Sequence, residues 1–218
     1  MRADETRFEM WWRWHLYRRW KNEPGRRSMY AFRAHLENAP RGSLAIDCGA
    51  NIGDMTAAML AHGLRVIAFE PDPICLDALH RRFATNPDVT IVAKAVGASA
   101  RQMPLYRSTT TQGRIRTEAS SVLQMTHHDR EPAGSVEVID LLSFIDGLGE
   151  PLYLLKLDIE GAEVEVMEAL LDRRGAEKIG RIFVETHERL DQDLARRTAA
   201  IRQRMQGPDF ANIDLDWG

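Results

Sequence analysis

Three acidic residues stand where short apolar runs of the sequence end, and they are the first candidates for chemistry. Asp47 follows the run LAI, Glu70 follows RVIAF and Asp158 follows LYLLKL. Runs of this length predict buried parallel strands, and in an open parallel sheet the ligand crevice lies outside the carboxyl ends of the strands. We therefore expect the three carboxylates to face one crevice.

The segment around Asp47, SLAIDCGANIGDMT, predicts a strand, a turn that contains glycines, and a helix. Gly49 lets the backbone approach a ligand closely, and a helix starting near Gly53 presents unpaired N–H groups. The dinucleotide fingerprint G-x-G-x-x-G is not matched, because Asn51 stands between the only two glycines of this turn. The Asp47 carboxylate would repel a pyrophosphate, but it suits a cation such as the ammonium of a methionine moiety next to a sulfonium.

Glu70 gives a second indication of the ligand. It stands about twenty residues after the turn, where a carboxylate at a strand end can bind both hydroxyls of a ribose. Together, Asp47 and Glu70 favour S-adenosylmethionine over NAD as the cofactor. An ordinary strand-to-helix turn without a ligand is the alternative, and the position of Glu70 makes it the weaker one.

A further predicted strand end supplies candidates for catalysis. Glu185 follows the run RIFV, and His187 comes two residues later. Methyl transfer to a hydroxyl requires removal of the acceptor proton, and His187 is the first candidate base because the unperturbed pKa of histidine lies near neutrality. The alternative is a divalent metal such as Mg²⁺, held by Asp158 and Glu185, which would lower the pKa of the acceptor. We favour the metal-free base, with His187, Asp158 and Glu185 as catalytic candidates.

The elements that position these residues alternate between strand and helix from Ser43 onward. This alternation predicts one α/β domain with a mostly parallel sheet and helices on both faces. Strands are predicted at 44–48, 65–70, 89–93, 103–107, 136–139, 152–157, 181–185 and 210–217, and helices at 53–62, 72–85, 140–147, 161–168 and 191–205. Residues 101–134 are the least regular part, with a polar loop at 108–114. Glu160 and Glu163 fit caps of the helix after them at least as well as catalysis.

Residues 1–40 are predicted to form a helical extension in front of the S-adenosylmethionine-binding domain at 41–218. A helix over 4–21 carries four of the five tryptophans, a turn at Pro24–Gly25 follows, and a second helix over 28–37 has Ser28 or a neighbour as its cap. Three roles remain open for the aromatic face of the first helix. It could lie on a membrane interface, form an acceptor pocket or homodimer contact, or pack on the domain.

Composition limits the class of protein. With 218 residues, 44% hydrophobic residues and a net charge of −3, the chain fits one α/β domain, and no nucleic-acid partner is expected. No apolar run reaches membrane-spanning length and no signal-peptide pattern is present, so a cytoplasmic location is expected. Cys48 and Cys75 have neither metal spacing nor a disulfide pattern, which predicts two free thiols.

The motifs DCGANIGDMT, FEPDP, KAVG, LKLDIEGAE and VETHE resemble the FkbM family of S-adenosylmethionine-dependent methyltransferases, a branch of the Rossmann-like class I methyltransferase fold. The resemblance runs from about Leu44 to His187. It implies O-methylation, often of sugars or polyketide-type natural products, and therefore a small-molecule or glycan acceptor. The Trp-rich extension departs from the family core, and we expect the usual final antiparallel pair of strands to be incomplete.

The resemblance also implies which residues hold the cofactor. The turn after the first strand would surround the methionine part, Glu70 the ribose, and the region from Lys94 to Val96 the adenine, while Ser120 and Ser121 match a hydroxyl segment that also touches the cofactor. The implied cofactor residues are Asp47, Gly49, Ala50, Asn51, Gly53, Glu70, Pro71, Asp72, Ala95, Val96, Ser121 and Asp158. Two other classes stay open, namely a catalytically silent cofactor-binding module and, less favoured because of Asp47 and the missing third glycine, an NAD-type oxidoreductase.

Overall fold

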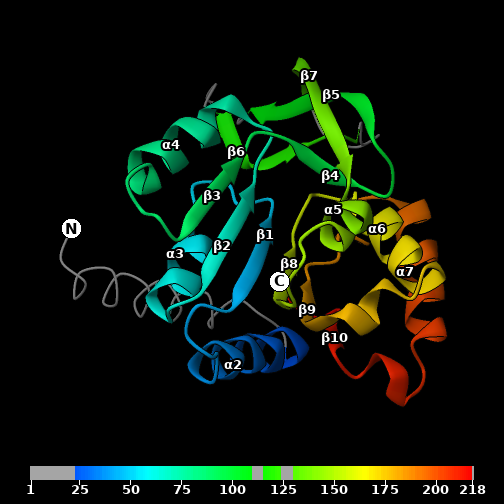
Figure 1. Ribbon diagram of the computed structural model, residues 1–218. Helices are drawn as coiled ribbons and strands as arrows, with labels where there is room; N and C mark the ends of the chain where they lie inside the picture. Colours follow the sequence, from blue (N-terminus) through cyan, green and yellow to red (C-terminus); the bar gives the residue numbers. More distant parts are fainter. Residues whose placement is uncertain (1–22, 110–114, 124–129, 218) are drawn as a thin grey trace.

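The computed structural model of the chain describes residues 23–109, 115–123 and 130–217. Its centre is a six-stranded sheet in the order β10-β9-β8-β1-β2-β3, in which all neighbouring strands are parallel (Figure 1). The strands are β1 (Leu44–Cys48), β2 (Arg65–Phe69), β3 (Val89–Val92), β8 (Leu152–Leu157), β9 (Ile179–Val184) and β10 (Ile213–Asp214). The predicted Rossmann-like α/β fold with a parallel central sheet is confirmed.

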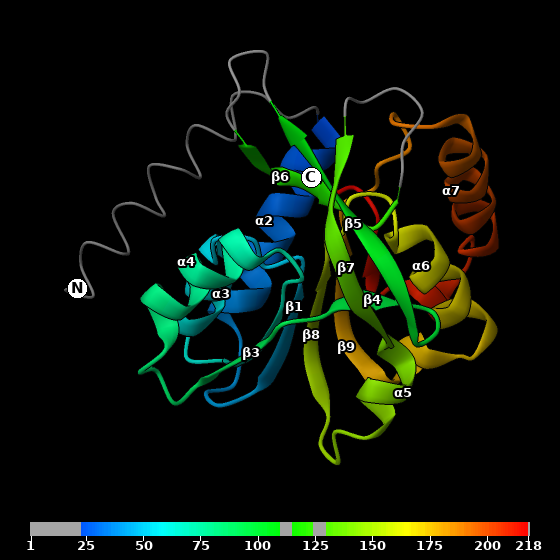
Figure 2. The same ribbon diagram turned by 90° about the horizontal axis from the view of Figure 1, so that it is seen from above.

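Helices cover both faces of this sheet, as predicted (Figure 2). One face carries α2 (Glu23–Glu37), α3 (Asp54–Ala61) and α4 (Pro73–Phe83), and the other carries α5 (Leu141–Asp146), α6 (Glu163–Asp172) and α7 (Gln192–Arg204). Side chains along a strand alternate between the faces. Leu44, Ile46 and Cys48 of β1 therefore pack in the core beneath α5, α6 and α7, while Ala45 packs with α2 and α3.

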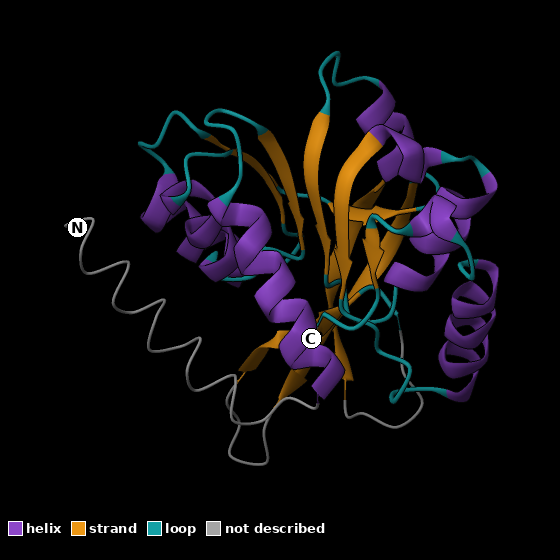
Figure 3. Ribbon diagram, turned by 90° about the horizontal axis from the view of Figure 1, so that it is seen from below, coloured by secondary structure: helices purple, strands orange, loops and turns teal. Residues whose placement is uncertain are grey.

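Helix α2 is part of the domain core. The ring of Phe32 lies 5.1 Å from that of Phe183 and 5.6 Å from that of Trp217, so α2 packs on β9 and on the C-terminal end of the described chain (Figure 3). The prediction of a turn at Pro24–Gly25 is wrong, because α2 begins at Glu23. Proline is tolerated in the first turn of a helix, where its missing N–H would have no partner in any case.

Ser28 is the other correction in α2, because it lies buried inside the helix and caps nothing. The predicted helix over 4–21 lies outside the described residues, and with it the predicted membrane or dimer contact of its tryptophans. The division of the chain at residue 40 stays a prediction, although α2 shares a hydrophobic cluster with the sheet. In the described part of the chain, no helix combines the length and the apolar composition that crossing a membrane requires.

A second sheet replaces the irregular segment that the sequence predicted over 101–134. It has the order β4-β7-β5-β6 and consists of β4 (Ala95–Gly97), β5 (Arg101–Thr109), β6 (Ile115–Ser121) and β7 (Arg130–Asp140). Strand β5 pairs antiparallel with both neighbours. The strands predicted at 103–107 and 136–139 are confirmed as parts of β5 and β7, although both are longer than predicted. Strands β4 and β6 and the pairing into a sheet were not predicted, because pairing between distant strands decides the conformation of such polar segments.

The end of the chain also differs from prediction. The strand expected at 210–217 is only Ile213–Asp214, which pairs parallel with β9. Leu215 and Trp217 leave the sheet and are buried in the cores on its two faces. Within the described residues all strand pairs of the main sheet are parallel, and the expectation of an incomplete final antiparallel pair stays a prediction. Cys48 and Cys75 are both free and buried.

Candidate active site

The turn after β1 joins the carboxyl ends of three strands. The N–H groups of Gly49 and Ala50 both donate to the carbonyl oxygen of Phe69 at the end of β2, each at 3.0 Å. On its other side, a Cβ at Gly49 would lie 1.8 Å from the carbonyl oxygen of Asp158, just after β8. The φ angle of Gly49 is 74°, which also favours glycine. The predicted turn is therefore confirmed, and it holds β1, β2 and β8 around one site.

The Glu70 carboxylate lies at this site, where the sequence placed it. Its Oε2 accepts the N–H of Asn51 at 2.8 Å, and its Oε1 accepts the N–H of Asp72 at 2.8 Å. Burial raises the pKa of Glu70 to about 7, although these two hydrogen bonds act in the opposite direction. Each oxygen has a further lone pair, so the oriented carboxylate can still accept hydrogen bonds from a ligand.

This raised pKa predicts a pH dependence of stability. The pKa is about 7 in the folded protein against an ordinary 4.5, so the folded state binds more protons between these values. The contribution of Glu70 to the free energy of unfolding is fully present below pH 4.5 and is lost as the pH rises through 7, by roughly 3 kcal/mol. In Glu70→Gln this decline should disappear, and urea unfolding across that pH range measures it. Equal pH slopes in the two proteins would contradict the assignment.

Asp47 is buried against protein partners rather than exposed to a ligand. It lies opposite Lys156 in the paired strands β1 and β8, and its Oδ1 is 3.2 Å from Lys156 Nζ. Its Oδ2 accepts a hydrogen bond from Thr56 Oγ1 at 2.7 Å, and the side chain has no exposed surface. The expectation that this carboxylate contacts the cationic part of the ligand is therefore wrong, because Lys156 supplies its counter-charge. Lys156 Nζ also donates to Gly49 O at 2.9 Å, so the pair supports the turn.

Asp72 fastens the second sheet to the cofactor side of the fold. Its Oδ1 accepts the N–H of Ile74 at 2.9 Å, which confirms it as the cap of α4. Arg107 of β5 donates to both carboxylate oxygens at 2.7 and 2.6 Å, and Ser120 Oγ of β6 donates at 2.8 Å. Burial raises the pKa of Asp72, but the hydrogen bonds, that from Arg107 above all, hold it below its usual value. Arg107 was missed in the sequence because nothing local marks its partner.

The other residues implied as cofactor contacts lie in the same region. Asn51, with a φ of 50°, and Gly53, with a φ of 86°, belong to the turn before α3, and Pro71 stands between Glu70 and Asp72. Ala95 and Val96 are buried in β4. Ser121 is buried too, and its Oγ donates to Glu160 O at 2.9 Å and accepts the N–H of Leu123 at 3.0 Å. Ser121 therefore supports the turn after β8.

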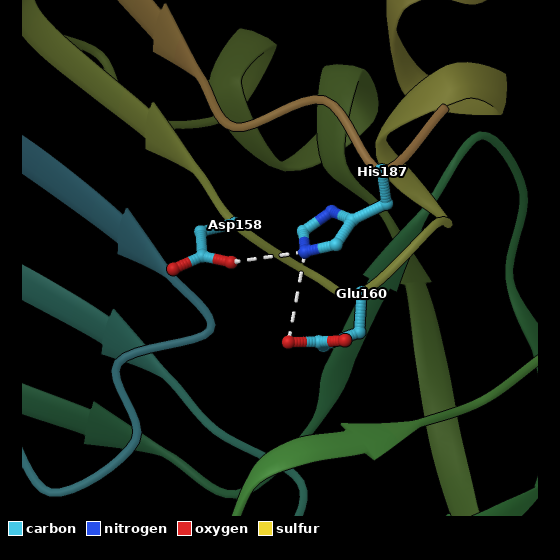
Figure 4. A group of neighbouring side chains, drawn as sticks. All are labelled: Asp158, Glu160 and His187. Atoms are coloured by element: carbon cyan, nitrogen blue, oxygen red, sulfur yellow. Dashed lines mark ion pairs between the residues drawn. The ribbon is translucent and has the colours of Figure 1, made fainter. Parts of the chain in front are cut away.

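A histidine and two carboxylates meet at the ends of β8 and β9 (Figure 4). His187 Nε2 lies 3.6 Å from Glu160 Oε1 and 3.9 Å from Asp158 Oδ1. On the other side of the ring, Nδ1 lies 3.0 Å from Glu163 Oε1, which also accepts the backbone N–H of His187 at 3.0 Å. Glu163 Oε2 accepts the N–H of Gly161 at 2.8 Å and so holds the turn before α6, but the N-cap of α6 is Ala162 and has no side-chain cap hydrogen bond, so the predicted capping role of Glu163 is not confirmed.

The expectation of a near-neutral pKa for His187 is wrong. Burial lowers this pKa, but the hydrogen bonds and charges of Glu160 and Glu163 raise it to about 11. At neutral pH the ring is therefore protonated on both nitrogens and positively charged, and in this state it cannot accept a proton from an acceptor. The prediction failed because it used the unperturbed pKa and left out the acidic residues that the fold brings to the ring.

Glu185 lies apart from this group. It follows β9 directly, and its N–H donates to the carbonyl oxygen of Leu157 at 2.8 Å, while its charge acts on Lys156. In the described part of the chain, the side chains found close enough to share a metal ion are those of Asp158, Glu160 and His187. The alternative metal pair of Asp158 and Glu185 differs from this group and stays a prediction. From the sequence, Glu160 fitted a capping role at least as readily as a catalytic one, because its spacing from His187 in the sequence does not show that the two side chains meet.

Comparison with known proteins identifies the family. The model of the FkbM methyltransferase domain matches residues 47–213. The methyltransferase sdnD of Sordaria araneosa is 29% identical over 181 residues, and the match covers 70% of each chain.

Two solved structures are also similar. A TehB-like SAM-dependent methyltransferase from Corynebacterium glutamicum is 17% identical, with a TM-score of 0.37, over 91% of this chain and 83% of that one. A protein described as a methyltransferase of an antibiotic biosynthesis pathway, from Anabaena variabilis, is 16% identical, with a TM-score of 0.33, over 74% of this chain. The chain spans 46% of the length of the Anabaena protein. The family match itself covers well over half of the chain and every polar residue of the site, and the protein belongs to the FkbM family of methyltransferases.

Proposed function

We propose that the protein transfers a methyl group from S-adenosylmethionine to a hydroxyl of a small acceptor, either a sugar or glycan or a hydroxylated natural product. The observation that carries the proposal is the Glu70 carboxylate, which the N–H groups of Asn51 and Asp72 orient at the end of β2. A carboxylate held in this way can accept hydrogen bonds from the two neighbouring hydroxyls of a ribose.

The surroundings of Glu70 fit the rest of an adenosine. Ile52 and Ile74 are exposed, although large hydrophobic side chains are mostly buried in the described part of the chain. Both belong to the segments that hold Glu70, since Ile52 follows Asn51 and Ile74 opens α4 just after Asp72. Exposed apolar surface next to a buried carboxylate suits a ligand that has a flat base on one side and hydroxyls on the other.

The group at the ends of β8 and β9 fits the acceptor. Methyl transfer from a sulfonium requires the acceptor oxygen to be aligned with the methyl carbon. Asp158 and Glu160 are partly exposed, at 27% and 18% of their side chains, whereas His187 is buried. Because His187 is protonated, we assign proton removal to a carboxylate, Glu160 or Asp158, as the new C–O bond forms and the C–S bond breaks. His187, 3.6 Å from Glu160 and 3.9 Å from Asp158, helps to fix the positions of these carboxylates.

Glu160→Gln tests this assignment. The change removes a charge but keeps the shape, so turnover with a competent acceptor should fall by roughly 100-fold while affinity for S-adenosylmethionine stays near that of the unaltered protein. Glu188→Gln is the matched control, because Glu188 is exposed and lies one residue from His187. Formation of S-adenosylhomocysteine and of methylated product, followed by mass spectrometry over a panel of glycans and hydroxylated natural products, measures turnover. Equal turnover of both variants would remove Glu160 from the reaction.

A further inference from the structure

We propose that Asp158, Glu160 and His187 bind one divalent first-row transition-metal ion at the carboxyl ends of β8 and β9. The inference about binding rests on the geometry of these side chains alone. What the ion does there rests on the proposed function, because a bound metal ion would lower the pKa of an acceptor hydroxyl.

The spacing of the three side chains fits one ion. One ligand atom from each lies within 4.8 Å of the others. Metal bonds to nitrogen and oxygen of about 2.0–2.2 Å place two ligands of one ion roughly 3 to 3.5 Å apart at tetrahedral or octahedral angles. The distances from His187 Nε2 to Glu160 Oε1 and Asp158 Oδ1, 3.6 and 3.9 Å, are only slightly longer. Small side-chain shifts would bring all three ligands onto an ion.

The histidine is held as a metal ligand would be. Its ring is 2% exposed, and Glu163 fixes it by accepting from both Nδ1 and the backbone N–H. A carboxylate behind the ring nitrogen that faces away from the metal is the usual second partner of a metal-bound histidine. The buried Nε2 then points at the carboxylates of Glu160 and Asp158, 3.6 and 3.9 Å away. A metal ion would replace the proton on Nε2, because a metal-bound imidazole is neutral, and it would bind all three ligand atoms together.

Charge and access favour the same conclusion. Three carboxylates, those of Asp158, Glu160 and Glu163, surround a single imidazole. Lys156 is 3.4 Å from Asp158, but it is already paired with Asp47. Among the described residues these carboxylates outnumber the imidazole, and a divalent cation would offset part of their charge. The partial exposure of Asp158 and Glu160 gives an ion a route from solvent.

The ligand set selects the kind of metal. Mg²⁺ and Ca²⁺ prefer oxygen ligands only, whereas one imidazole with two carboxylates suits Mn²⁺, Fe²⁺, Co²⁺ or Zn²⁺. The inferred site therefore differs from the Mg²⁺ pair of Asp158 and Glu185 in both its residues and its metal. Mn²⁺ is the best probe, because its electron spin resonance reports its ligands directly.

The experiment titrates the full-length, chelator-treated protein with Mn²⁺ by calorimetry and records the pulsed electron spin resonance of the complex. We expect one ion per chain, a coupling to an imidazole nitrogen, and an excess of Mg²⁺ that does not displace the ion. Glu160→Gln should weaken Mn²⁺ binding by about tenfold or more, and Glu188→Gln should leave it unchanged. Both positions are partly exposed, so these variants should fold, and circular dichroism checks this.

Three results would overturn the inference: no stoichiometric Mn²⁺ binding by the folded protein, a bound ion without nitrogen coupling, or binding that Glu185→Gln abolishes and Glu160→Gln does not. Binding of S-adenosylmethionine is measured on the same samples. Cofactor binding without Mn²⁺ binding would contradict this inference alone, and Mn²⁺ binding without cofactor binding would contradict the proposed function alone.

Discussion

Gly49→Ala is expected to lower the free energy of unfolding by about 3 kcal/mol or more and to abolish binding of the methyl donor. The new Cβ would lie 1.8 Å from the carbonyl oxygen of Asp158, which is backbone and cannot rotate away. Either the turn or the end of β8 would have to move, and the hydrogen bonds of Gly49 and Ala50 to Phe69 would be lost or lengthened. Urea unfolding and calorimetry with S-adenosylmethionine measure the two effects.

Gly42→Ala is the matched control for this prediction. Gly42 has a φ of 81°, similar to the 74° of Gly49, but a Cβ there would meet nothing within 4 Å. Its loss of stability should therefore be only the backbone strain of a left-handed residue, about 1–2 kcal/mol, with normal cofactor binding. Equal losses in the two variants would show that the close approach of the turn to β8 does not exist.

Lys156→Met is expected to destabilise the protein by about 3–5 kcal/mol and to weaken cofactor binding through the turn. Burial lowers the pKa of Lys156, but the charges of Asp47 and Asp158 raise it above the usual value for lysine, so the side chain is charged in the core. Without it, Asp47 would be a buried charge without a counter-charge, and the carbonyl oxygen of Gly49 would lose the hydrogen bond from Lys156. Denaturant unfolding measures the loss.

Two further variants separate the pair from a general effect of removing a lysine. Lys178→Met removes an exposed lysine that pairs with Asp146, and it should change stability by less than about 1 kcal/mol. In the background of Asp47→Asn, Lys156→Met should cost clearly less than it does alone, because no buried charge is then left unpaired. Additive losses in the double variant would contradict the pairing of Asp47 with Lys156.

The sequence predicted the site where the signal was local. The run before each strand end, the glycines of the turn and the cap at Asp72 depend on neighbouring residues, and all of them are found in the structure. The position of Glu70 followed for the same reason, since the strand length and the turn set where it ends. These features were enough to predict the parallel sheet and the edge of it at which the candidate site lies.

What the sequence did not predict depends on residues that only the fold brings together. We predicted that Asp47 contacts the ligand because its partner Lys156 belongs to β8, and only the register of the two strands puts them opposite each other. We predicted that His187 is a base with a near-neutral pKa, because the residues that raise this pKa, Glu160 and Glu163, belong to another turn of the chain. Parts of β5 and β7 were predicted as strands, but their union in a second sheet was not, because that sheet depends on pairing between distant strands and on the contact of Arg107 with Asp72.

The central claim is that the site around Glu70 binds the methyl donor S-adenosylmethionine. Calorimetric titration of the purified chain with S-adenosylmethionine tests it most directly, with S-adenosylhomocysteine and NAD as comparators and Glu70→Ala as the variant. The account predicts saturable binding of the two adenosyl compounds at one site per chain, no binding of NAD, and loss of most of the affinity in the variant. Failure of the folded protein to bind either compound, or binding of NAD in their place, would contradict it.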